Sequence, residues 1–490
     1  MRVEAVTTGK ARTVLPQGSK WKGKYDARLM SGKRQKNQRL LAFMAEGRGE
    51  TPMAVSGGTE PLMAKREPES LASTEQLMEE VCQRKNLEMA LKRVKANKGS
   101  PGVDGMTVEK LPDYLRKHWL SIREQLLSGT YQPQPVKRVE IPKPNGGVRK
   151  LGIPTVLDRF IQQAVMQVLQ QRWDRTFSEH SHGFRPGRSA HQAVAQAQRY
   201  LAEGHRWVVD IDLEKFFDRV NHDILMGRIA KRVSDRRLLK LIRAFLNAGV
   251  MENGLVSPTD EGTPQGGPLS PLLSNLMLDD LDRELQRRGL RFARYADDCN
   301  IYVRSQRAGQ RVMMSITRFI TTKLKLKVNE SKSAVARPWE RKFLGMSFTG
   351  NREPKRRIAP KALTRFKERI RELTRRARGI SLERMIEALA RYLNGWRAYF
   401  GFCQTPSVLT ELDSWIRRRL RSVAWKQWKR GKRRFAELRA RKVGKDLAAQ
   451  TAGSPHGPWR IARSPALSFA LPNAYFQSLG LPTLAARPTA

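Results

Sequence analysis

The sequence predicts an α+β protein, in which a mixed middle region with antiparallel strands is followed by a helical, strongly basic region. Three observations support this prediction. Strand-like segments in the middle of the chain are separated by turn sequences. Residues 351–450 show helical periodicity and no strand pattern. The same 100 residues hold 29 Lys and Arg against 9 Asp and Glu, a net charge of +20.

The overall charge indicates a polyanionic partner. The chain holds 93 Lys and Arg against 46 Asp and Glu, a net charge of +47, and the usual partner of such a positive field is nucleic acid. Cys82, Cys299 and Cys403 lie far apart, which excludes a disulfide scaffold and a cysteine-rich zinc module. Because there is no signal-peptide pattern and no apolar run of about 18 residues, we expect a cytoplasmic protein without a membrane partner.

Composition divides the chain into four segments. Residues 1–72 hold 14 Lys and Arg against 7 Asp and Glu and include pieces rich in Gly, Ser and Pro, so they are predicted to be a basic, largely disordered extension. The mixed α and β part is expected over residues 73–350. The helical region follows over residues 351–450, and residues 451–490 are expected to be a C-terminal tail.

The mixed part begins with a helix, because apolar residues recur at helical spacing after Ser73. Residues 136–142 and 148–153 alternate in polarity on either side of a Pro-Asn-Gly-Gly turn, which predicts a β-hairpin. The further elements expected in order are a helix over 155–175, a buried strand over 207–212, a helix over 270–288 and two strands over 292–303 that meet in a tight turn.

Three carboxylates are placed where these strands end. Asp212 closes the apolar strand, and Asp297 and Asp298 lie at the tip of the later hairpin. Such carboxylates are costly unless a cation or hydrogen-bond donors compensate them. Oxygen ligands of this kind suit Mg²⁺, and two such ions about 4 Å apart can activate an attacking hydroxyl. An Asp-Asp pair alone is more often a turn, so the prediction depends on the surrounding sequence.

That surrounding sequence resembles the reverse transcriptases. Tyr295-Ala296-Asp297-Asp298 resembles their YxDD box, and residues 210–218 (DIDLEKFFD) resemble their first palm motif. Residues 262–271 (GTPQGGPLSP), 326–332 and 343–346 are similar to three further motifs of the family. Residues 392–400 (YLNGWRAYF) resemble the thumb motif of group II intron-encoded proteins, so that the resemblance covers about residues 75–480.

The resemblance implies a right-hand polymerase with fingers, an RRM-like palm and an all-α basic thumb/maturase domain. It also implies two Mg²⁺ ions per active site, with metal-binding positions at Asp212, Leu213, Asp297 and Asp298, of which Asp297 is expected to be the main turn ligand and Asp298 the more peripheral one. Asp210 competes with Asp212, since side chains two residues apart on a strand face the same side. The family spacing to residues 216–218 favours Asp212.

The resemblance further implies a nucleotide site. Lys143 and Arg149 flank the turn of the first hairpin and are expected on the triphosphate, unless they are solvated charges. Gln265 is expected near the incoming nucleotide or, alternatively, as a turn cap. Phe217 is expected on the sugar, with Phe216 as a competitor and core packing as the alternative. Lys332 is expected to neutralise primer and nucleotide phosphates, unless it is a surface charge.

Two groups of arginines are predicted to bind RNA. Arg185 and Arg188 lie in a segment with His180, His182 and His191; because a zinc site lacks a further ligand there, template contact or plain packing is favoured. Arg397, Arg417, Arg418 and Arg419 lie in the basic helical region, where guanidinium groups suit phosphates. Trp396, Tyr399 and Phe400 are expected mainly in the helical core.

Taken together, the motifs predict an RNA-directed DNA polymerase and maturase of a group II intron. The expected partners are the intron RNA, an RNA template with a DNA primer, dNTPs and target DNA. Two alternatives stay open: another bacterial reverse transcriptase, such as a retron type, and an RNA-binding splicing factor with an inactive palm. An endonuclease module is not expected, because only His456 and no cysteine follow Cys403.

Overall fold

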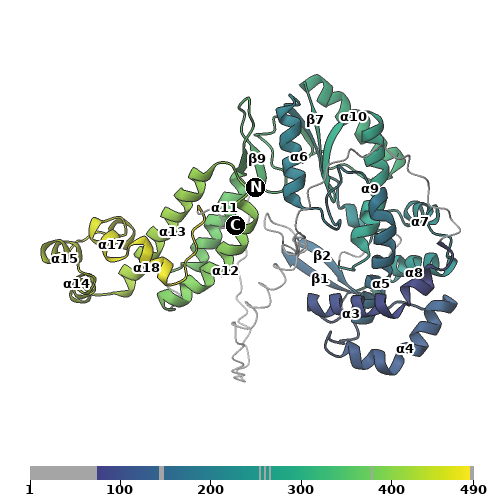
Figure 1. Ribbon diagram of the computed structural model, residues 1–490, viewed down its shortest axis with the longest axis horizontal. Helices are drawn as coiled ribbons and strands as arrows, with labels where there is room; N and C mark the ends of the chain where they lie inside the picture. Colours follow the sequence, from purple (N-terminus) through teal and green to yellow (C-terminus); the bar gives the residue numbers. More distant parts are fainter. Residues whose placement is uncertain are drawn as a thin grey trace, which may run out of the picture. The chain divides into compact units, whose positions relative to one another are not determined.

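The computed structural model describes residues 74–142, 148–252, 255–258, 261–263, 266–376 and 379–485. The extension predicted over residues 1–72 lies outside these ranges. The described chain contains a fingers region, a palm region and a C-terminal helical region, which are coloured from purple to yellow along the sequence in Figure 1.

The fingers region is a small sheet covered by helices. Strands β1 (Val136–Pro142) and β2 (Val148–Ile153) pair in antiparallel register, with Arg138 opposite Gly152, which confirms the predicted hairpin strands. β1 also pairs in parallel with β4 (Val250–Glu252), and β4 pairs with β5, giving the order β2-β1-β4-β5. The remaining elements are β5 (Leu255–Ser257), α2 (Leu77–Val81), α3 (Arg84–Asn97), α4 (Leu111–Ser128), α5 (Val156–Trp173), α7 (His222–Ala230) and α8 (Arg236–Asn247).

The palm is a four-stranded sheet with the order β6-β7-β3-β8, in which all neighbours are antiparallel. Figure 1 shows helices α6, α9 and α10 around it. Its elements are α6 (Ala190–Ala202), β3 (Trp207–Ile211), α9 (Ser270–Arg287), β6 (Arg291–Tyr295), β7 (Asp298–Val303), α10 (Gln306–Lys323) and β8 (Ala334–Ala336).

Alternation along the palm strands explains how both faces of the sheet are covered. Val208 and Tyr302 pack in one apolar cluster with residues of α6, whereas their neighbours Val209 and Ile301 pack in another with residues of α9 and α10. Because successive strand residues point to opposite faces, a strand that is apolar at every position is buried on both sides. This is why residues 207–209 are apolar in succession, while the first polar residue of the strand, Asp210, lies near its end.

The helical region begins later than the sequence predicted. Strands β9 (Met346–Phe348) and β10 (Arg356–Ile358) form a two-stranded sheet, so the expectation of helix alone from residue 351 is wrong for the first residues. Helices α11 (Pro360–Leu373), α12 (Leu382–Phe400) and α13 (Pro406–Gln427) follow. Their apolar sides meet in one buried cluster that includes Phe366, Leu389 and Ile416.

Residues 451–485 continue the same helical packing. After α14 (Gly431–Ala440) and α15 (Lys445–Ala452) come three short helices, α16 (Pro458–Ile461), α17 (Pro465–Ala470) and α18 (Asn473–Ser478). Leu467 and Phe476 are fully buried in the cluster that holds α12 and α13. Backbone N–H groups of Leu484 and Ala485 donate to the buried carboxylate of Asp413. The segment predicted to be a tail is therefore packed as far as residue 485.

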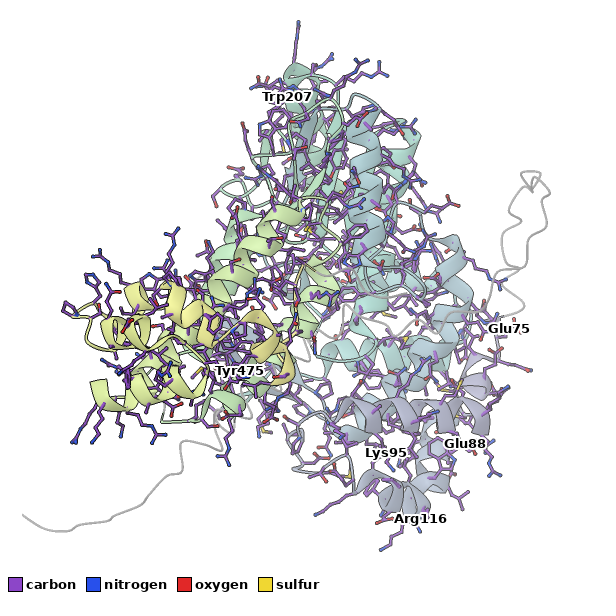
Figure 2. The ribbon with its side chains drawn as sticks, turned by 60° about the vertical axis from the view of Figure 1, so that its left-hand side comes forward. Glu75, Glu88, Lys95, Arg116, Trp207 and Tyr475 are labelled. Atoms are coloured by element: carbon purple, nitrogen blue, oxygen red, sulfur yellow. The ribbon has the colours of Figure 1, made fainter. Side chains whose placement is uncertain are left out.

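A mixed α and β part followed by a helical C-terminal region confirms the predicted fold class. Among the helices of the described chain, none combines the length and apolar character needed to cross a membrane. Side chains with nitrogen tips project outward around the C-terminal helices near Tyr475 (Figure 2), in agreement with the basic composition of this region.

Candidate active site

The three predicted carboxylates lie at one end of the palm sheet. Strand β3 ends at Ile211, which pairs with Cys299 of β7. Asp212 therefore follows the end of one strand, and Asp298 begins the adjacent antiparallel strand. Asp297 lies in the turn between β6 and β7, next to Ala296, whose φ of 57° is in the left-handed region. The sheet thus brings residues 85 positions apart in the sequence to one edge.

Like charges gather at this edge. The surroundings raise the pKa of Asp298 to about 7, first through desolvation and then through the negative charges of Asp297, Asp210 and Asp212. A carboxyl pKa that is raised by neighbouring carboxylates indicates a place where added positive charge is stabilising. Positive charges already lie nearby: Lys342 acts to lower the pKa of Asp298, and the Lys332 Nζ lies 3.4 Å from Asp212 Oδ2.

These residues fit a divalent metal in chemistry and charge, but they do not form a compact ligand cluster. Oxygen ligands that repel one another are the donor set that Mg²⁺ prefers. Within the part of the chain that the structure describes, no group of three or more His, Cys, Asp or Glu side chains is arranged to hold a metal ion. The Leu213 side chain is a buried hydrocarbon without a donor atom, so only the Leu213 backbone carbonyl is suited to a metal-binding role.

Asp210 and Asp212 have different partners. Asp210 Oδ2 accepts hydrogen bonds from Arg341 Nε at 2.9 Å and Nη2 at 2.6 Å. Burial raises the pKa of Asp210, while Arg341 acts in the opposite direction. Among the described residues, the ion-pair partner of Asp212 is the exposed Lys332 and not an arginine. The Asp212 backbone N–H donates to Ser333 Oγ at 3.0 Å, which fixes the end of β3. These contacts support a structural role for Asp210 and favour Asp212 as the functional carboxylate.

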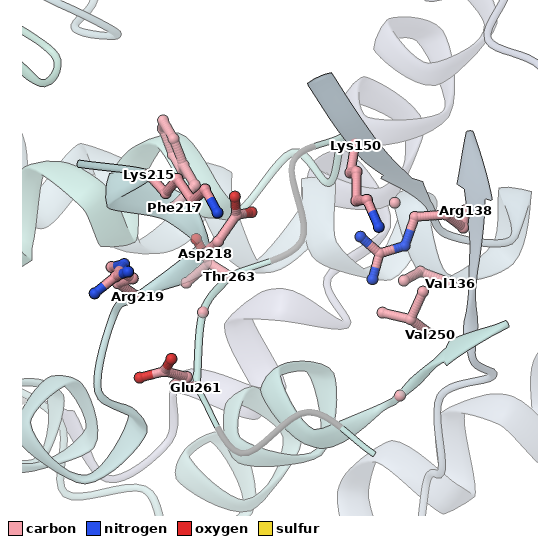
Figure 3. Close-up of a pocket in the computed structure, with 13 residues that line it drawn as sticks. Val136, Arg138, Lys150, Lys215, Phe217, Asp218, Arg219, Val250, Glu261 and Thr263 are labelled. Atoms are coloured by element: carbon pink, nitrogen blue, oxygen red, sulfur yellow. The ribbon is translucent and has the colours of Figure 1, made fainter. Parts of the chain in front are cut away.

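A cavity of about 470 Å³ lies between the fingers sheet and the palm (Figure 3). Arg138 and Lys150 point into it from β1 and β2, and Phe217 and Asp218 line it from the other side. Phe217 is half-buried at this wall, whereas Phe216 is only 2% exposed and belongs to the core. Of the two candidates for the sugar contact, Phe217 is the one that reaches the cavity.

The other predicted nucleotide-binding residues have mixed outcomes. Lys143 and Gln265 lie outside the described residues, as does the side chain of Arg149, whose backbone pairs with Ile141 in the hairpin. Lys332 is 66% exposed beside Asp212, so it combines an accessible charge with a position at the carboxylate edge. The sequence reasoning missed Arg138 and Lys150, although both belong to the hairpin on which it placed basic nucleotide ligands.

Comparison with known proteins agrees with this geometry. Residues 141–348 match the family model described as reverse transcriptase (RNA-dependent DNA polymerase), and residues 363–442 match the group II intron maturase-specific domain. The chain combines a reverse transcriptase domain with a maturase-specific domain. The resemblance to group II intron-encoded proteins is therefore confirmed.

Curated relatives show the same similarity. The chain is 42% identical to protein YkfC of Escherichia coli (strain K12) over 195 residues, which are 39% of this chain and 51% of YkfC. It is 39% identical to the group II intron-encoded protein LtrA of Lactococcus lactis subsp. cremoris over 207 residues, 42% of this chain and 34% of LtrA. The putative COX1/OXI3 intron 1 protein of Saccharomyces cerevisiae is 31% identical over 205 residues, 41% of this chain and 24% of that protein. The chain thus spans about half of YkfC and less of the other two.

Within the reverse transcriptase domain, the prediction that Arg185 contacts RNA conflicts with the structure. Its side chain is 4% exposed and forms an ion pair with Asp174. It also donates to the backbone carbonyls of Asp174, Ser178 and Ser181. A guanidinium used in this way holds a loop and is not available to a phosphate. Arg188 is half-buried, with one long bond of 3.4 Å to the Glu179 carbonyl, so the prediction for it stays open.

The histidines of this segment serve packing. His182 Nε2 lies 2.6 Å from Gln196 Oε1, and desolvation lowers the pKa of His182 to about 4. His191 stacks on Phe402 at a ring distance of 4.5 Å and contacts the Tyr399 carbonyl. His182 and His191 are thus engaged in contacts within the fold.

The arginines predicted to bind RNA in the helical region differ from one another. Arg417 is half-buried, with a bond of 3.5 Å to Ser414. Arg418 lies over the Trp459 ring at 4.1 Å, and Arg419 Nε donates to Thr374 Oγ1 at 2.6 Å. Arg397 is half-buried on α12.

Two of the three aromatic residues of the thumb motif join the helical core, as expected. Trp396 is buried in it, and Phe400 packs against it and stacks on Trp396. Tyr399 is half-buried, and its hydroxyl donates to the Leu344 carbonyl at 2.7 Å. This contact ties α12 to the segment that precedes β9.

Proposed function

We propose that this protein is the RNA-directed DNA polymerase of a group II intron and that it also binds the intron RNA and assists its splicing and mobility. The observation that carries the proposal is the group of like-charged carboxylates at Asp212, Asp297 and Asp298, at one end of the sheet in a reverse transcriptase domain. The match to a maturase-specific domain supports the intron RNA as partner and argues against a retron-type enzyme.

The proposed chemistry is nucleotide transfer to a primer 3′-hydroxyl. Two Mg²⁺ ions, when bound, would activate this hydroxyl and stabilise the oxygen that leaves with pyrophosphate. Asp212, Asp297 and, more peripherally, Asp298 would hold them, together with the backbone of Leu213. Lys332 would exchange its contact with Asp212 for the phosphates at the primer end. Polymerisation of this kind depends mainly on positioning and charge neutralisation.

The nucleotide would enter beside the cavity between fingers and palm. We assign Lys143 and Arg149 to the triphosphate, with Arg138 and Lys150 as further positive charge on the same hairpin. Phe217 would stack on the sugar and discriminate against a 2′-hydroxyl, and Gln265 would contact the incoming nucleotide. An RNA template with a DNA primer, and later the target DNA, would occupy the surface adjoining this site.

Primer extension on an RNA template tests the proposal. Asp297→Asn keeps the shape of the side chain but removes its charge, so extension with Mg²⁺ should fall at least about 100-fold, since even partners behind metal ligands cost 10- to 100-fold. RNA affinity should not change. Asp113→Asn on the exposed face of α4 is the control and should extend at the wild-type rate.

The same variant separates the two activities. Splicing chemistry belongs to the intron RNA, so the Asp297→Asn protein should still promote splicing at low Mg²⁺. Near-wild-type extension by Asp297→Asn would refute the catalytic assignment. A wild-type protein that promotes splicing without extending any primer would favour the alternative of a non-catalytic splicing factor.

A further inference from the structure

The residue just before Tyr295 is an arginine buried completely beneath the carboxylate turn. Arg294 ends in a guanidinium whose side chain is 0% exposed, as is that of its ion-pair partner Asp282 on α9. Placing such a pair out of water is costly, and replacing both members by apolar residues is often neutral for stability. A buried pair at this position therefore calls for an explanation other than stability.

All five N–H donors of Arg294 have an acceptor. Nε and Nη2 donate to the two Asp282 oxygens at 2.7 and 2.5 Å. Nη2 also donates to Ser181 Oγ at 2.7 Å. Nη1 donates to Asn275 Oδ1 at 3.1 Å and to the Ala296 carbonyl at 2.8 Å. Arginine is the side chain that offers five donors in a planar fork, whereas lysine offers three from one nitrogen.

The bond to Ala296 links this network to the active site. Ala296 is the residue before Asp297, and its φ of 57° is a conformation that costs free energy for a residue with a Cβ atom. Its carbonyl, which the turn directs inward, is satisfied by Arg294. The Ala296 carbonyl carbon and the Asp297 nitrogen belong to the same planar peptide unit. The hydrogen bond from Arg294 to this carbonyl therefore also fixes the orientation of Asp297.

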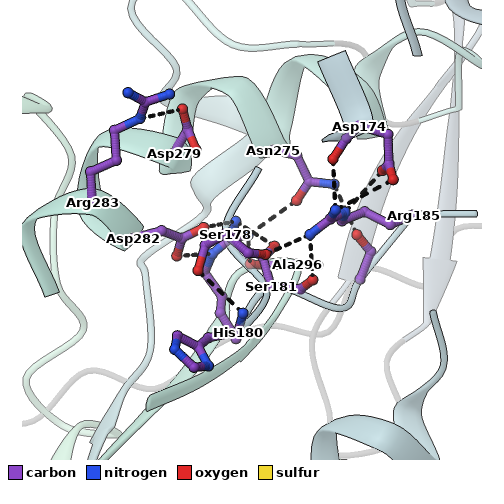
Figure 4. A network of polar contacts seen from close by, with 12 residues as sticks. Asp174, Ser178, His180, Ser181, Arg185, Asn275, Asp279, Asp282, Arg283 and Ala296 are labelled. Carbon is purple, nitrogen blue, oxygen red and sulfur yellow. Dashed lines mark hydrogen bonds and ion pairs between the residues drawn. The ribbon is translucent and has the colours of Figure 1, made fainter. Parts of the chain in front are cut away.

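A second layer holds the other side of the same turn. Asn275 Oδ1 accepts from Arg294, and its Nδ2 donates to the Gly183 carbonyl at 2.8 Å. A Cβ atom on Gly183 would lie 2.3 Å from the Ala296 nitrogen, so only glycine allows this approach. The segment around Gly183 also pairs with Arg294 through two backbone hydrogen bonds, from His182 N and to the His180 carbonyl. Figure 4 shows Asn275, Asp282 and Ser181, three side chains of this network, close to Ala296.

We propose that Arg294, held by Asp282 and Asn275, is a positioning residue that fixes the Ala296–Asp297 peptide in the orientation needed for metal-dependent synthesis. The expected loss of extension rate rests on the proposed polymerase function. The expected ordering of the Ala296–Asp297 turn by Arg294 does not. The buried pair would provide a rigid support for a turn that carries repelling carboxylates, and removing the Nη1 donor would release that turn.

Arg294→Lys is the first test, with Arg237→Lys as the matched control. Arg237 also uses a multiply bonded guanidinium, donating to Glu79 and Asp235 in the fingers region. We expect the extension rate per active site of Arg294→Lys to fall about 10- to 100-fold, as for residues behind metal ligands. The Mg²⁺ concentration for half-maximal rate should rise. Hydrogen exchange of a peptide covering residues 292–303 should become faster without added metal. Arg237→Lys should leave all three readouts unchanged.

A paired apolar substitution separates positioning from folding. Arg294→Met alone leaves Asp282 buried and uncompensated, so it should unfold readily. Combining it with Asp282→Leu removes both charges and should recover the unfolding temperature, but the Ala296 carbonyl still lacks its donor. The rate per active site and the Mg²⁺ dependence of this double variant should stay impaired.

Two results would overturn the inference. One is a stable double variant with wild-type rate and Mg²⁺ dependence, which would make the pair purely structural. The other is unchanged exchange of the 292–303 peptide in a folded Arg294→Lys protein. A wild-type protein that extends no primer would instead refute the proposed function, while the exchange measurement would still decide whether Arg294 orders the turn.

Discussion

Arginines are held differently in the reverse transcriptase part and in the C-terminal helices. In the first, Arg294 and Arg185 form ion pairs with the carboxylates of Asp282 and Asp174. In the second, several guanidinium groups lie over indole rings: Arg418 over Trp459 at 4.1 Å, Arg434 over Trp425 at 4.6 Å and Arg419 over Trp415 at 5.3 Å. A carboxylate neutralises the charge that it holds, whereas an aromatic ring orients the cation and leaves its charge in place.

This difference suits two tasks. The palm needs a rigid support, so its buried arginines are compensated within the fold. The helical region has few acidic residues, 9 among residues 351–450, and its tryptophans fix arginine side chains while the surface remains positive. A positive surface with ordered side chains is what a structured RNA requires.

The largest expected effect concerns the carboxylates of the palm. Asp210 is ion-paired with Arg341, which indicates a structural role for this carboxylate. Asp212→Asn should therefore reduce extension at least about 100-fold. Asp210→Asn should reduce extension much less. Primer extension and thermal unfolding, measured on both variants, test this. Equal losses of extension in two well-folded proteins would break the distinction.

The second prediction concerns the charge of the helical region. Replacing Arg417, Arg418 and Arg419 by Ala should weaken intron RNA binding. The slope of log affinity against log salt should fall by about 0.7 to 0.9 for each phosphate that the variant no longer neutralises. Filter binding at several salt concentrations measures the slope. A variant with Lys at the same three positions keeps the charge and should retain most of the salt slope.

Single variants sharpen this prediction. Neighbouring helix residues are about 100° apart around the axis, so three in a row do not face one ligand equally. Arg419 donates to the buried Thr374 hydroxyl. Replacing Arg419 by Ala should therefore lower the stability of the protein and change the salt slope of RNA binding little. Replacing Arg417 by Ala should lower the salt slope and change the stability little. An unchanged slope in a folded triple variant would move the RNA surface elsewhere.

The sequence was sufficient for the fold class and for the carboxylate edge, because both depend on local patterns. Alternation predicted the strands, and the Asp-Asp turn after an apolar strand marked the edge. The sequence was insufficient where a side chain's role depends on distant partners. Arg185 resembles an RNA ligand in the sequence, and only the fold surrounds it with Asp174 and three backbone carbonyls.

Arg294 shows the same limit from the other side. A lone arginine in a strand reads as an edge residue or a surface charge, and nothing in the adjacent sequence identifies Asp282 or Asn275 as its partners. Only the packing of α9 against β6 brings the three together. Likewise, residues 451–485 lack a strong periodic pattern because their helices are short, and their packing depends on contacts with α13.

The third prediction uses pH to separate the two regions. The folded protein raises the pKa of Asp298 from 3.8 to about 7, so between these values it retains a proton that the unfolded chain releases. Stability contributed by this group therefore falls as the pH rises through that window. Without metal, Asp298→Asn should raise the unfolding temperature relative to wild type at pH 8, and the difference should shrink toward pH 4.

The matching control lies in the helical region. Guanidinium and ammonium groups do not titrate in this window, so the effect of Arg434→Lys on the unfolding temperature should be independent of pH. Calorimetry in a chelating buffer measures both variants. A pH-independent difference for Asp298→Asn would contradict a raised pKa of Asp298, and with it the burial and the neighbouring negative charges that cause it.

The smallest expected effect tests the indole contacts themselves. Trp459→Leu removes the ring under Arg418 but keeps the backbone carbonyl to which Arg418 donates. The decrease in the free energy of unfolding should be about 0.5 to 1 kcal/mol, the usual size of an exposed cation–π contact. A double-mutant cycle with Arg418→Ala, followed by urea unfolding, isolates the coupling between the two side chains.

The palm offers a matched pair for this cycle. Arg337 lies over Trp207 at the same 4.1 Å, and Trp207 is labelled in Figure 2. Both pairs should show a similar coupling energy, because the distance from the guanidinium to the ring is the same. Only the Arg418 pair should also change RNA affinity, since an unanchored guanidinium loses more side-chain entropy when it binds a phosphate. A coupling energy of zero at Arg418 would mean that the indole of Trp459 does not orient the guanidinium. The two regions would then differ only in their content of acidic and basic residues.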